Sequence, residues 1–341
     1  MASNKTGSAA HFGGSPGPVS FYHGVSVKVK PFKTYQAQVD LLRSRGMQIE
    51  DNDRAVDILR THNYYRLSGY WHSMRQQDPT TGQSLDVFRD GTSFDLVVEL
   101  YDFDALLRHA VFEDLAPIEL ALRSLLGYYL GQINPLIYLD STQLGPAART
   151  VSRHGVCEYD IWLKKYQQAL LLSREDFVEH HRVQYDGVLP VWVAVEVMDW
   201  GMLSYLYRFS PNLVRNEIAR DCEMSAPQLE SWLKSLNILR NCTAHHARLF
   251  TRVFDIKPKQ IRDTRMTPIN SSLHLIFGQL SLIRYLHATL DLDGNADNLI
   301  TVLENYPHNT LVPLRRTGTP NNWQNLDLWI KPPQASDSVG T

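Results

Sequence analysis

The sequence contains few cysteines, no long apolar run and no excess of charge of one sign. Its three cysteines, Cys157, Cys222 and Cys242, form no CxxC pair. This excludes a disulfide framework and a recognisable zinc site, and it favours a reducing, cytoplasmic compartment. No stretch reaches the roughly 18 uncharged apolar residues of a membrane span, because Glu196 and Asp199 interrupt the longest candidate. The first residues lack the basic and apolar regions of a signal peptide, so we expect none.

Balanced charge excludes a further class of protein. The 34 Lys and Arg against 36 Asp and Glu give a net charge of -2, so the chain is not held to nucleic acid by positive charge over its whole surface. Any contact with nucleic acid must therefore be local. Neither GxxxxGK[ST] nor GxGxxG occurs, and the histidines follow no metal-ligand spacing. We expect neither a metal nor another cofactor.

The composition is that of a folded protein with a large core. The chain has 341 residues, 43% of them apolar and 10% aromatic. Residues 1–27 consist mainly of Gly, Ser, Ala, Asn and Pro, which predicts a disordered segment. We expect one all-α domain over residues 28–292, followed by a C-terminal helix and extended tail over 293–341. Three large apolar residues should anchor that tail: Trp323, Leu328 and Trp329.

Apolar residues recur every three or four positions through most of the chain, which predicts helices. The predicted helices cover residues 32–45, 53–65, 94–131, 159–172, 190–209, 226–250 and 270–286. Pro117 should kink the third of them. Residues 77–91 should form a loop or small hairpin, and residues 173–187 are polar. The fold class is therefore all-α, a helical bundle with additional helices at its N-terminus.

The predicted helix at 226–250 contains an anomaly. At about 100° per residue, its apolar positions form one stripe, made of Leu229, Trp232, Leu233, Leu236 and Leu239. Arg240 lies at the edge of this stripe, whereas Asn241 and His245 lie on the opposite face with Lys234 and Asn237. An arginine at the margin of an apolar stripe is unfavourable unless an anion or an acceptor receives it.

The types of these residues fit a phosphate site. Arg240 could bind two phosphate oxygens, His245 could transfer a proton near neutral pH, and Asn241 could orient either group. These groups suffice, without metal, for attack of a ribose 2′-hydroxyl on the adjacent phosphate. Alternatively, Arg240 reaches a carboxylate on a neighbouring helix, and the pair His245–His246 only ends its own helix, where imidazolium suits the helix dipole. The residues alone leave both interpretations open.

Several segments resemble a known family. Residues 240–245 (RNCTAH) resemble the Arg-x4–6-His signature of HEPN ribonucleases, and residues 239–252 (LRNCTAHHARLFTR) are similar to the corresponding stretch of bacterial Abi-like proteins, the abortive-infection AbiD/AbiF group. Residues 63–71 (NYYRLSGYW), 118–123 (IELALR), 190–207 and the tail at 318–329 resemble other blocks of that family. The resemblance covers about residues 28–330.

The resemblance implies an HEPN-like helical bundle that cleaves single-stranded RNA without metal, as an antiphage or toxin–antitoxin effector. Arg240 would stabilise the scissile phosphate, His245 would act as general acid or base, and Asn241 would position them. HEPN enzymes are typically dimers, and AbiF-like members imply a small noncoding RNA as a partner. On a straight helix Arg240 and His245 diverge by about 140°. A two-fold partner, or a break near Thr243, would bring them together.

Other residues are candidates for supporting roles. His246 is an auxiliary or structural residue, and Glu196 either orients Arg240 or packs against another basic residue. Residues 240–265 contain seven Lys and Arg against two Asp, a local basic patch of net +5. The predicted RNA-binding residues are Arg123, Arg248, Arg252, Lys257 and Lys259, although Arg123 fits a salt bridge with Glu119 or Glu196 better.

Two further hypotheses compete with the ribonuclease. The same basic face could hold a structured RNA without cutting it, or the motif could be a salt-bridge network inside a helical scaffold. Aromatic residues that could stack on bases are more typical of the core here: Tyr64, Tyr65, Tyr70 and Trp71.

Overall fold

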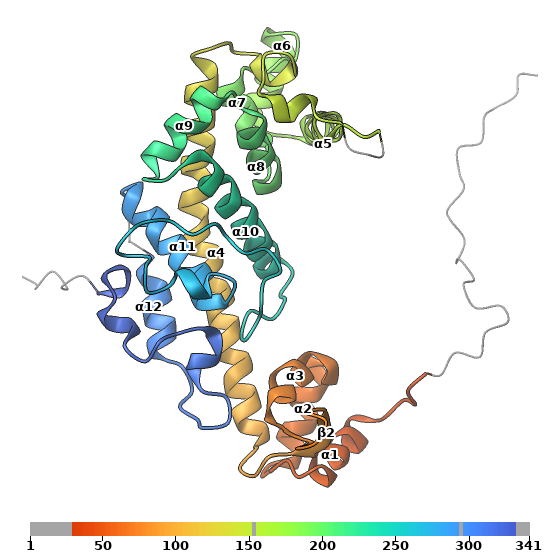
Figure 1. The fold of residues 1–341 in the computed structure, drawn as a ribbon. Helices are drawn as coiled ribbons and strands as arrows, with labels where there is room; N and C mark the ends of the chain where they lie inside the picture. Colours follow the sequence, from red (N-terminus) through yellow and green to blue (C-terminus); the bar gives the residue numbers. More distant parts are fainter. Residues whose placement is uncertain (1–28, 152–154, 293–295, 332–341) are drawn as a thin grey trace, which may run out of the picture.

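The computed structural model describes residues 29–151, 155–292 and 296–331 (Figure 1). These residues form twelve α-helices and one two-stranded hairpin, which confirms the all-α prediction. The predicted disorder of residues 1–27 falls outside the described residues. No helix in the described part of the chain is long and apolar enough to cross a lipid bilayer.

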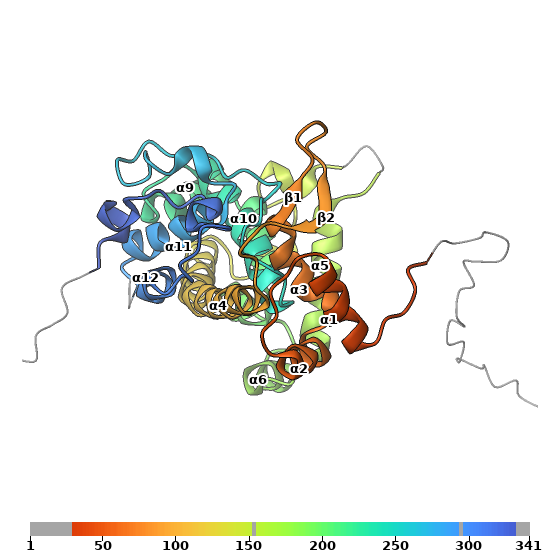
Figure 2. The same ribbon diagram turned by 90° about the horizontal axis from the view of Figure 1, so that it is seen from below.

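The N-terminal unit consists of three short helices and the hairpin. They are α1 (Tyr35–Ser44), α2 (Asn52–His62), α3 (Tyr64–Trp71), β1 (Arg75–Gln77) and β2 (Ser84–Phe88). The predicted helix at 53–65 ends earlier, because Asn63 has a positive φ of 60° and its side chain caps α3 instead. Figure 2 shows this unit beside one end of α4.

The central element is α4 (Phe94–Gly131), a helix of 38 residues that is about 57 Å long at 1.5 Å per residue. Ser93 caps its first turn, as its position predicted. Pro117 lies inside α4 without ending it. The helix contacts α3 near its N-terminal end, α7 and α9 near its other end, and α10, α11 and α12 between them (Figure 1). These other helices of the bundle therefore pack along α4.

Five helices follow between residues 158 and 221. They are α5 (Glu158–Leu172), α6 (Asp176–Gln184), α7 (Val191–Ala194), α8 (Trp200–Phe209) and α9 (Asn212–Asp221). The prediction of one helix over 190–209 was wrong, because the backbone is extended at Met198 and Asp199. Asp199 then caps α8 by accepting a hydrogen bond from the Met202 amide. The polar segment at 173–187 contains α6, which its composition did not reveal.

Three helices complete the bundle: α10 (Ala226–Ala244), α11 (Ile276–Thr289) and α12 (Asp297–Glu304). The helix predicted from Asn270 begins later, because Asn270 lies in a short 3-10 turn. The predicted tail anchors are confirmed. Trp323, Leu328 and Trp329 are at most 5% exposed, and the Trp329 ring stacks on Phe277 of α11.

Candidate active site

Helix α10 carries the RNxxxH motif, and its inner face is apolar as predicted. Ser225 and Gln228 form a capping box at its start. The inward stripe is buried at every predicted position: Leu229, Trp232, Leu233, Leu236 and Leu239. Asn241 and His245 are exposed, and so is Lys234. The buried stripe thus fixes which face of α10 is open, and Asn241 and His245 lie on that open face.

The helix ends at Ala244, so its predicted extension to residue 250 was wrong. His245 is the C-cap residue, and its amide still donates to the Asn241 carbonyl over 3.1 Å. His246 then adopts a positive φ of 52°. The amides of His246 and Ala247 donate to the carbonyls of Thr243 and Cys242 over 3.1 and 2.8 Å, which is a Schellman motif. The exposed His246 therefore lies beyond the helix and not near its buried stripe.

Arg240 is partly buried, and its guanidinium has no acceptor. Its Nε is buried without a hydrogen-bond partner, and the described residues supply it with no ion pair. The Nε atoms of Arg75, Arg89, Arg123 and Arg215 are also buried without a partner. Unlike Arg240, however, every other described arginine that is buried or partly buried donates through at least one nitrogen of its guanidinium to a carbonyl, a carboxylate or a hydroxyl. An unsatisfied buried donor costs about 1–3 kcal/mol. This part of Arg240 is therefore available to a ligand.

Asp199 lies close enough for its charge to interact with Arg240, yet it does not pair with it. Its Oδ1 accepts from the Met202 amide over 2.8 Å, and its Oδ2 accepts from Lys165 Nζ over 2.5 Å. Burial opposes ionisation of this carboxyl, but the bonds from Lys165 and Met202, with the charges of Lys165 and Arg240, lower its pKa below the usual value. Asp199 thus adds negative potential near Arg240 while its own oxygens are occupied.

The start of α8 borders the open face of α10. A Cβ built on Gly201 would lie 3.3 Å from Asp199 Oδ1 and 3.7 Å from Asn237 Nδ2. Asn237 precedes Arg240 by about one helical turn. The α8 terminus therefore meets α10 immediately beside the arginine.

Helix α3 contacts the segment that follows the motif, residues 245–250. Arg66 Nη1 donates to the His246 carbonyl over 2.8 Å, although the two residues are 180 positions apart in the sequence. The guanidinium of Arg248 donates to the Gly69 carbonyl. Residues 63–71 and 245–250, two of the blocks that carry the family resemblance, thus lie side by side.

A buried carboxylate strengthens this junction. Asp104 of α4 has no exposed side-chain surface and accepts from the Tyr70 hydroxyl over 2.6 Å. It also accepts from the amides of Leu249 and Phe250, the latter over 2.7 Å, and pairs with Arg108. One carboxylate therefore ties α3, α4 and the segment after α10 together.

The comparison with known families agrees with these blocks. A family model described as Abi-like protein matches residues 57–251, more than half of the chain. The chain belongs to the Abi-like protein family. Neither a curated protein nor a solved structure matches it. The matched range contains α3, α4, α8 and α10, and thus every element of the junction described above. Family membership suggests a part in abortive-infection defence.

In this Abi-like protein, two of the predicted site residues, Glu196 and Arg123, form an ion pair with each other. The Glu196 carboxylate does not reach Arg240. It pairs with Arg123 over 3.4 Å. Arg123 also pairs with Glu119 over 2.6 Å and donates to the Met198 carbonyl over 2.9 Å. The salt bridges expected for Arg123 are therefore present, and they hold the break between α7 and α8 against α4. A role of Arg123 in RNA binding stays a prediction.

The basic segment after the motif divides into engaged and open side chains. The guanidinium of Arg248 is bound to α3, and that of Arg252 lies 5.8 Å from the Phe254 ring centre. Lys257 and Lys259 are exposed. The backbone of Lys259 bonds to Ser231 and Trp232 of α10 over 3.0 and 2.8 Å. Lys259 therefore lies beside the N-terminal half of α10, and Lys257 precedes it by two residues, whereas Arg248 and Arg252 support the segment beyond the end of α10.

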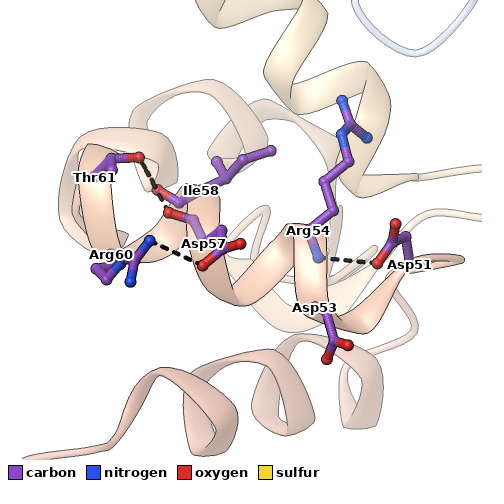
Figure 3. Close-up of a pocket in the computed structure, with 7 residues that line it drawn as sticks. All are labelled: Asp51, Asp53, Arg54, Asp57, Ile58, Arg60 and Thr61. Carbon is purple, nitrogen blue, oxygen red and sulfur yellow. Dashed lines mark hydrogen bonds and ion pairs between the residues drawn. The ribbon is translucent and has the colours of Figure 1, made fainter.

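A surface pocket on α2 contributes nothing to this site. Figure 3 shows its seven lining residues, which are the N-cap residue of α2 and six residues along the whole helix: Asp51, Asp53, Arg54, Asp57, Ile58, Arg60 and Thr61. Arg60 pairs with Asp57 over 3.1 Å, and Arg54 pairs with Asp95 of α4. Within residues 29–151, 155–292 and 296–331, no three His, Cys, Asp or Glu are grouped as ligands of a metal ion would be.

Sequence reasoning missed three residues of the site's surroundings. Asp104 had a signal, because it is a carboxylate within the apolar stripe of a long helix. Asp199 had a weaker one as a capping residue inside an apolar segment. Arg66 had none, since only the fold brings it to His246.

Proposed function

We propose that this Abi-like protein is a metal-independent HEPN endoribonuclease that cleaves single-stranded RNA. The observation that carries the proposal is the guanidinium of Arg240, which is partly buried and has no acceptor in the described chain. A group kept in this state matches the planar, bidentate geometry of a phosphate. The exposed His245 and Asn241 on the same helix supply the proton-transfer and orienting groups.

In the proposed reaction the ribose 2′-oxygen attacks the adjacent phosphorus. One His245 imidazole accepts the 2′-hydroxyl proton, and a second, protonated His245 donates a proton to the departing 5′-oxygen as the P–O5′ bond breaks. Arg240 stabilises the charge that develops on the phosphate oxygens. The products are a 2′,3′-cyclic phosphate and a 5′-hydroxyl, and one proton is taken up for each one released.

The geometry of α10 supports a dimeric site. The helix is regular from Arg240 to Ala244 and ends only at the C-cap residue His245, whose amide still donates to the Asn241 carbonyl, so the chain does not turn between Arg240 and His245 in a way that would bring the two side chains together. On this helix the two side chains diverge by about 140°. We propose that a second copy of the chain places its own α10 opposite the first, so that one composite site contains both Arg240 and both His245 residues.

The biological setting follows from the family. We propose an abortive-infection or toxin–antitoxin effector of the AbiF type that acts in the cytoplasm and is restrained by a small noncoding RNA. The exposed Lys257 and Lys259 beside α10 would contact the RNA backbone. Arg123, Arg248 and Arg252 would support this surface mainly through their bonds to the protein.

Cleavage of end-labelled single-stranded RNA in EDTA tests the proposal. Wild-type protein is compared with Arg240→Ala, His245→Ala and the control Arg262→Ala, which removes an exposed arginine of the same basic segment. We expect cleavage by the wild type and the control, and a loss of at least about 100-fold in the two motif variants. Equal cleavage by all four proteins would contradict the proposal. RNA binding without cleavage would instead favour an RNA-sensing module.

A further inference from the structure

One aromatic side chain of the NYYRLSGYW block is not in the core. Tyr70 and Trp71 are at most 2% exposed and Tyr64 is partly buried, as expected, but Tyr65 is 64% exposed. The prediction that Tyr65 belongs to the core was therefore wrong. A large exposed ring on a short helix that contacts the motif segment requires another explanation.

The position of Tyr65 on α3 brings it beside the candidate active site. Tyr65 and Gly69 are four residues apart and so share one face of the helix. Gly69 receives the Arg248 side chain, whose nearest atoms lie 3.5 Å from a Cβ built on that glycine. Arg66, which follows Tyr65 in the chain, donates to the His246 carbonyl over 2.8 Å. Tyr65 therefore lies about one helical turn from the contacts that hold the end of the motif.

The ring is held in place at the start of α3. The Tyr65 amide donates to Asn63 Oδ1 over 2.8 Å, and the ring packs edge-to-face on Tyr64 with centres 5.7 Å apart. Because Tyr64 in turn packs against the buried Trp71 over 5.0 Å, the aromatic contacts connect the exposed ring to the core. Such a ring presents a stacking surface at little entropic cost.

Two cations that pair with no carboxylate belong to the surroundings of this ring. Lys30 Nζ lies 5.6 Å from the centre of the Tyr65 ring. Arg66 follows Tyr65 directly in the chain. Lys30 and Arg66 are exposed, and neither pairs with a carboxylate of the described residues. A flat apolar surface bordered by unpaired cations matches a ligand that combines planar rings with negative charge, which is the chemistry of single-stranded RNA.

We infer that Tyr65 is a stacking platform for one unpaired nucleobase of the RNA strand that occupies the α10 site, with Lys30 and Arg66 facing the flanking phosphates. This inference rests on the proposed function, because it assigns the RNA its path from α10 onto α3. It also gives that site a selectivity. Only a strand with an unstacked base close to the scissile phosphate reaches both Tyr65 and Arg240, so a continuous duplex is excluded.

RNA affinity measured without cleavage tests this inference. The probe is a fluorescent single-stranded oligonucleotide with every 2′-oxygen methylated, so that no 2′-hydroxyl can attack. Tyr65→Ala is compared with Tyr65→Trp, which keeps a stacking ring, and with the control Tyr128→Ala, which removes a ring that is 61% exposed on α4. We expect Tyr65→Ala to raise the Kd about 5- to 100-fold, while the other two variants stay near the wild type.

A second arm identifies the stacked base. Single abasic positions are moved along the oligonucleotide. One position should weaken wild-type binding as much as Tyr65→Ala does, and it should add nothing further in Tyr65→Ala. An unchanged Kd in Tyr65→Ala would overturn the inference. A loss of affinity that disappears once the protein is concentrated enough to restore self-association would also overturn it, because Tyr65 would then contact a second copy of the chain.

The two proposals fail separately. If cleavage depends on Arg240 and His245 but Tyr65→Ala keeps wild-type Kd and kcat/KM, the stacking platform is refuted and the ribonuclease stands. If Tyr65→Ala and one abasic position weaken binding but no RNA is cut, the platform stands and the ribonuclease is refuted.

Discussion

Replacement of Arg240 by methionine should stabilise the fold while abolishing RNA cleavage. The buried Nε of Arg240 has no acceptor, and a buried donor in this state costs about 1–3 kcal/mol. Methionine keeps most of the apolar stem and removes the donor. The attraction to Asp199 that is lost is small, about 0–1 kcal/mol, because that carboxylate is 44% exposed and already bonded to Lys165. The free energy of unfolding should therefore rise by about 1–2 kcal/mol.

A bonded arginine supplies the matched control. Arg265 has a side-chain exposure of 27%, and its Nε and Nη2 both donate to the Asp263 carboxylate, over 3.0 and 2.6 Å. Arg265→Met should lower the free energy of unfolding by about 1–3 kcal/mol, because it removes charge-assisted hydrogen bonds. Urea denaturation of the three proteins measures both differences. Phosphate should raise the Tm of the wild type by mass action but not that of Arg240→Met.

The two substitutions must therefore change the free energy of unfolding in opposite directions. If Arg240→Met destabilises the protein as much as Arg265→Met, Arg240 belongs to the internal salt-bridge network of a scaffold. If Arg240→Met is more stable and still cuts RNA, the arginine has no part in catalysis. Either result refutes the reasoning that links its missing acceptor to a phosphate.

Two other substitutions test the surroundings of the site. His246→Gly should relieve the strain of the positive φ of 52° at the end of α10. The free energy of unfolding should rise by about 1–2 kcal/mol from this relief and fall by about 0.5–1 kcal/mol because glycine loses more chain entropy on folding. The Tm should therefore rise by about 1–2 °C, and an inactive His246→Gly would show that His246 takes part in chemistry. Burial raises the pKa of Asp114 to about 6, so the folded state binds this proton more tightly than the unfolded state, and the stability that the proton provides is lost between about pH 4 and pH 7. Asp114→Asn should therefore be more stable than the wild type by about 2–3 kcal/mol at pH 7.5 and equal to it at pH 4; a pH-independent difference in urea denaturation would contradict this.

The sequence predicted the helices that have strong local signals. α4 begins after Ser93 and ends at Gly131 as expected, since capping and apolar spacing agree along its whole length. The break at Met198 and Asp199 was missed, because the apolar residues on both sides fit one helical stripe. The end of α10 was missed because His246, not a glycine, takes the left-handed position that stops the helix.

The candidate site divides in a similar way. The helical spacing of about 100° per residue predicted Arg240 at the margin of the buried stripe. The structure places it there, without an acceptor for its guanidinium. The junction of α3 with residues 245–250 could not be predicted, because its contacts join residues about 145 to 180 positions apart. Pairwise spacing contains no information about such contacts. The exposure of Tyr65 was also missed, because it belongs to the same aromatic block as Tyr70 and Trp71, and both of these are buried.

The chemistry of the RNA ends tests the central claim most directly. Purified full-length protein is incubated with a defined single-stranded RNA in EDTA, and the fragments are analysed by mass spectrometry. We predict fragments with 2′,3′-cyclic phosphate and 5′-hydroxyl ends, which are absent with Arg240→Ala and His245→Ala. Fragments with 3′-hydroxyl and 5′-phosphate ends, or cyclic phosphate ends that persist in both variants, would contradict it.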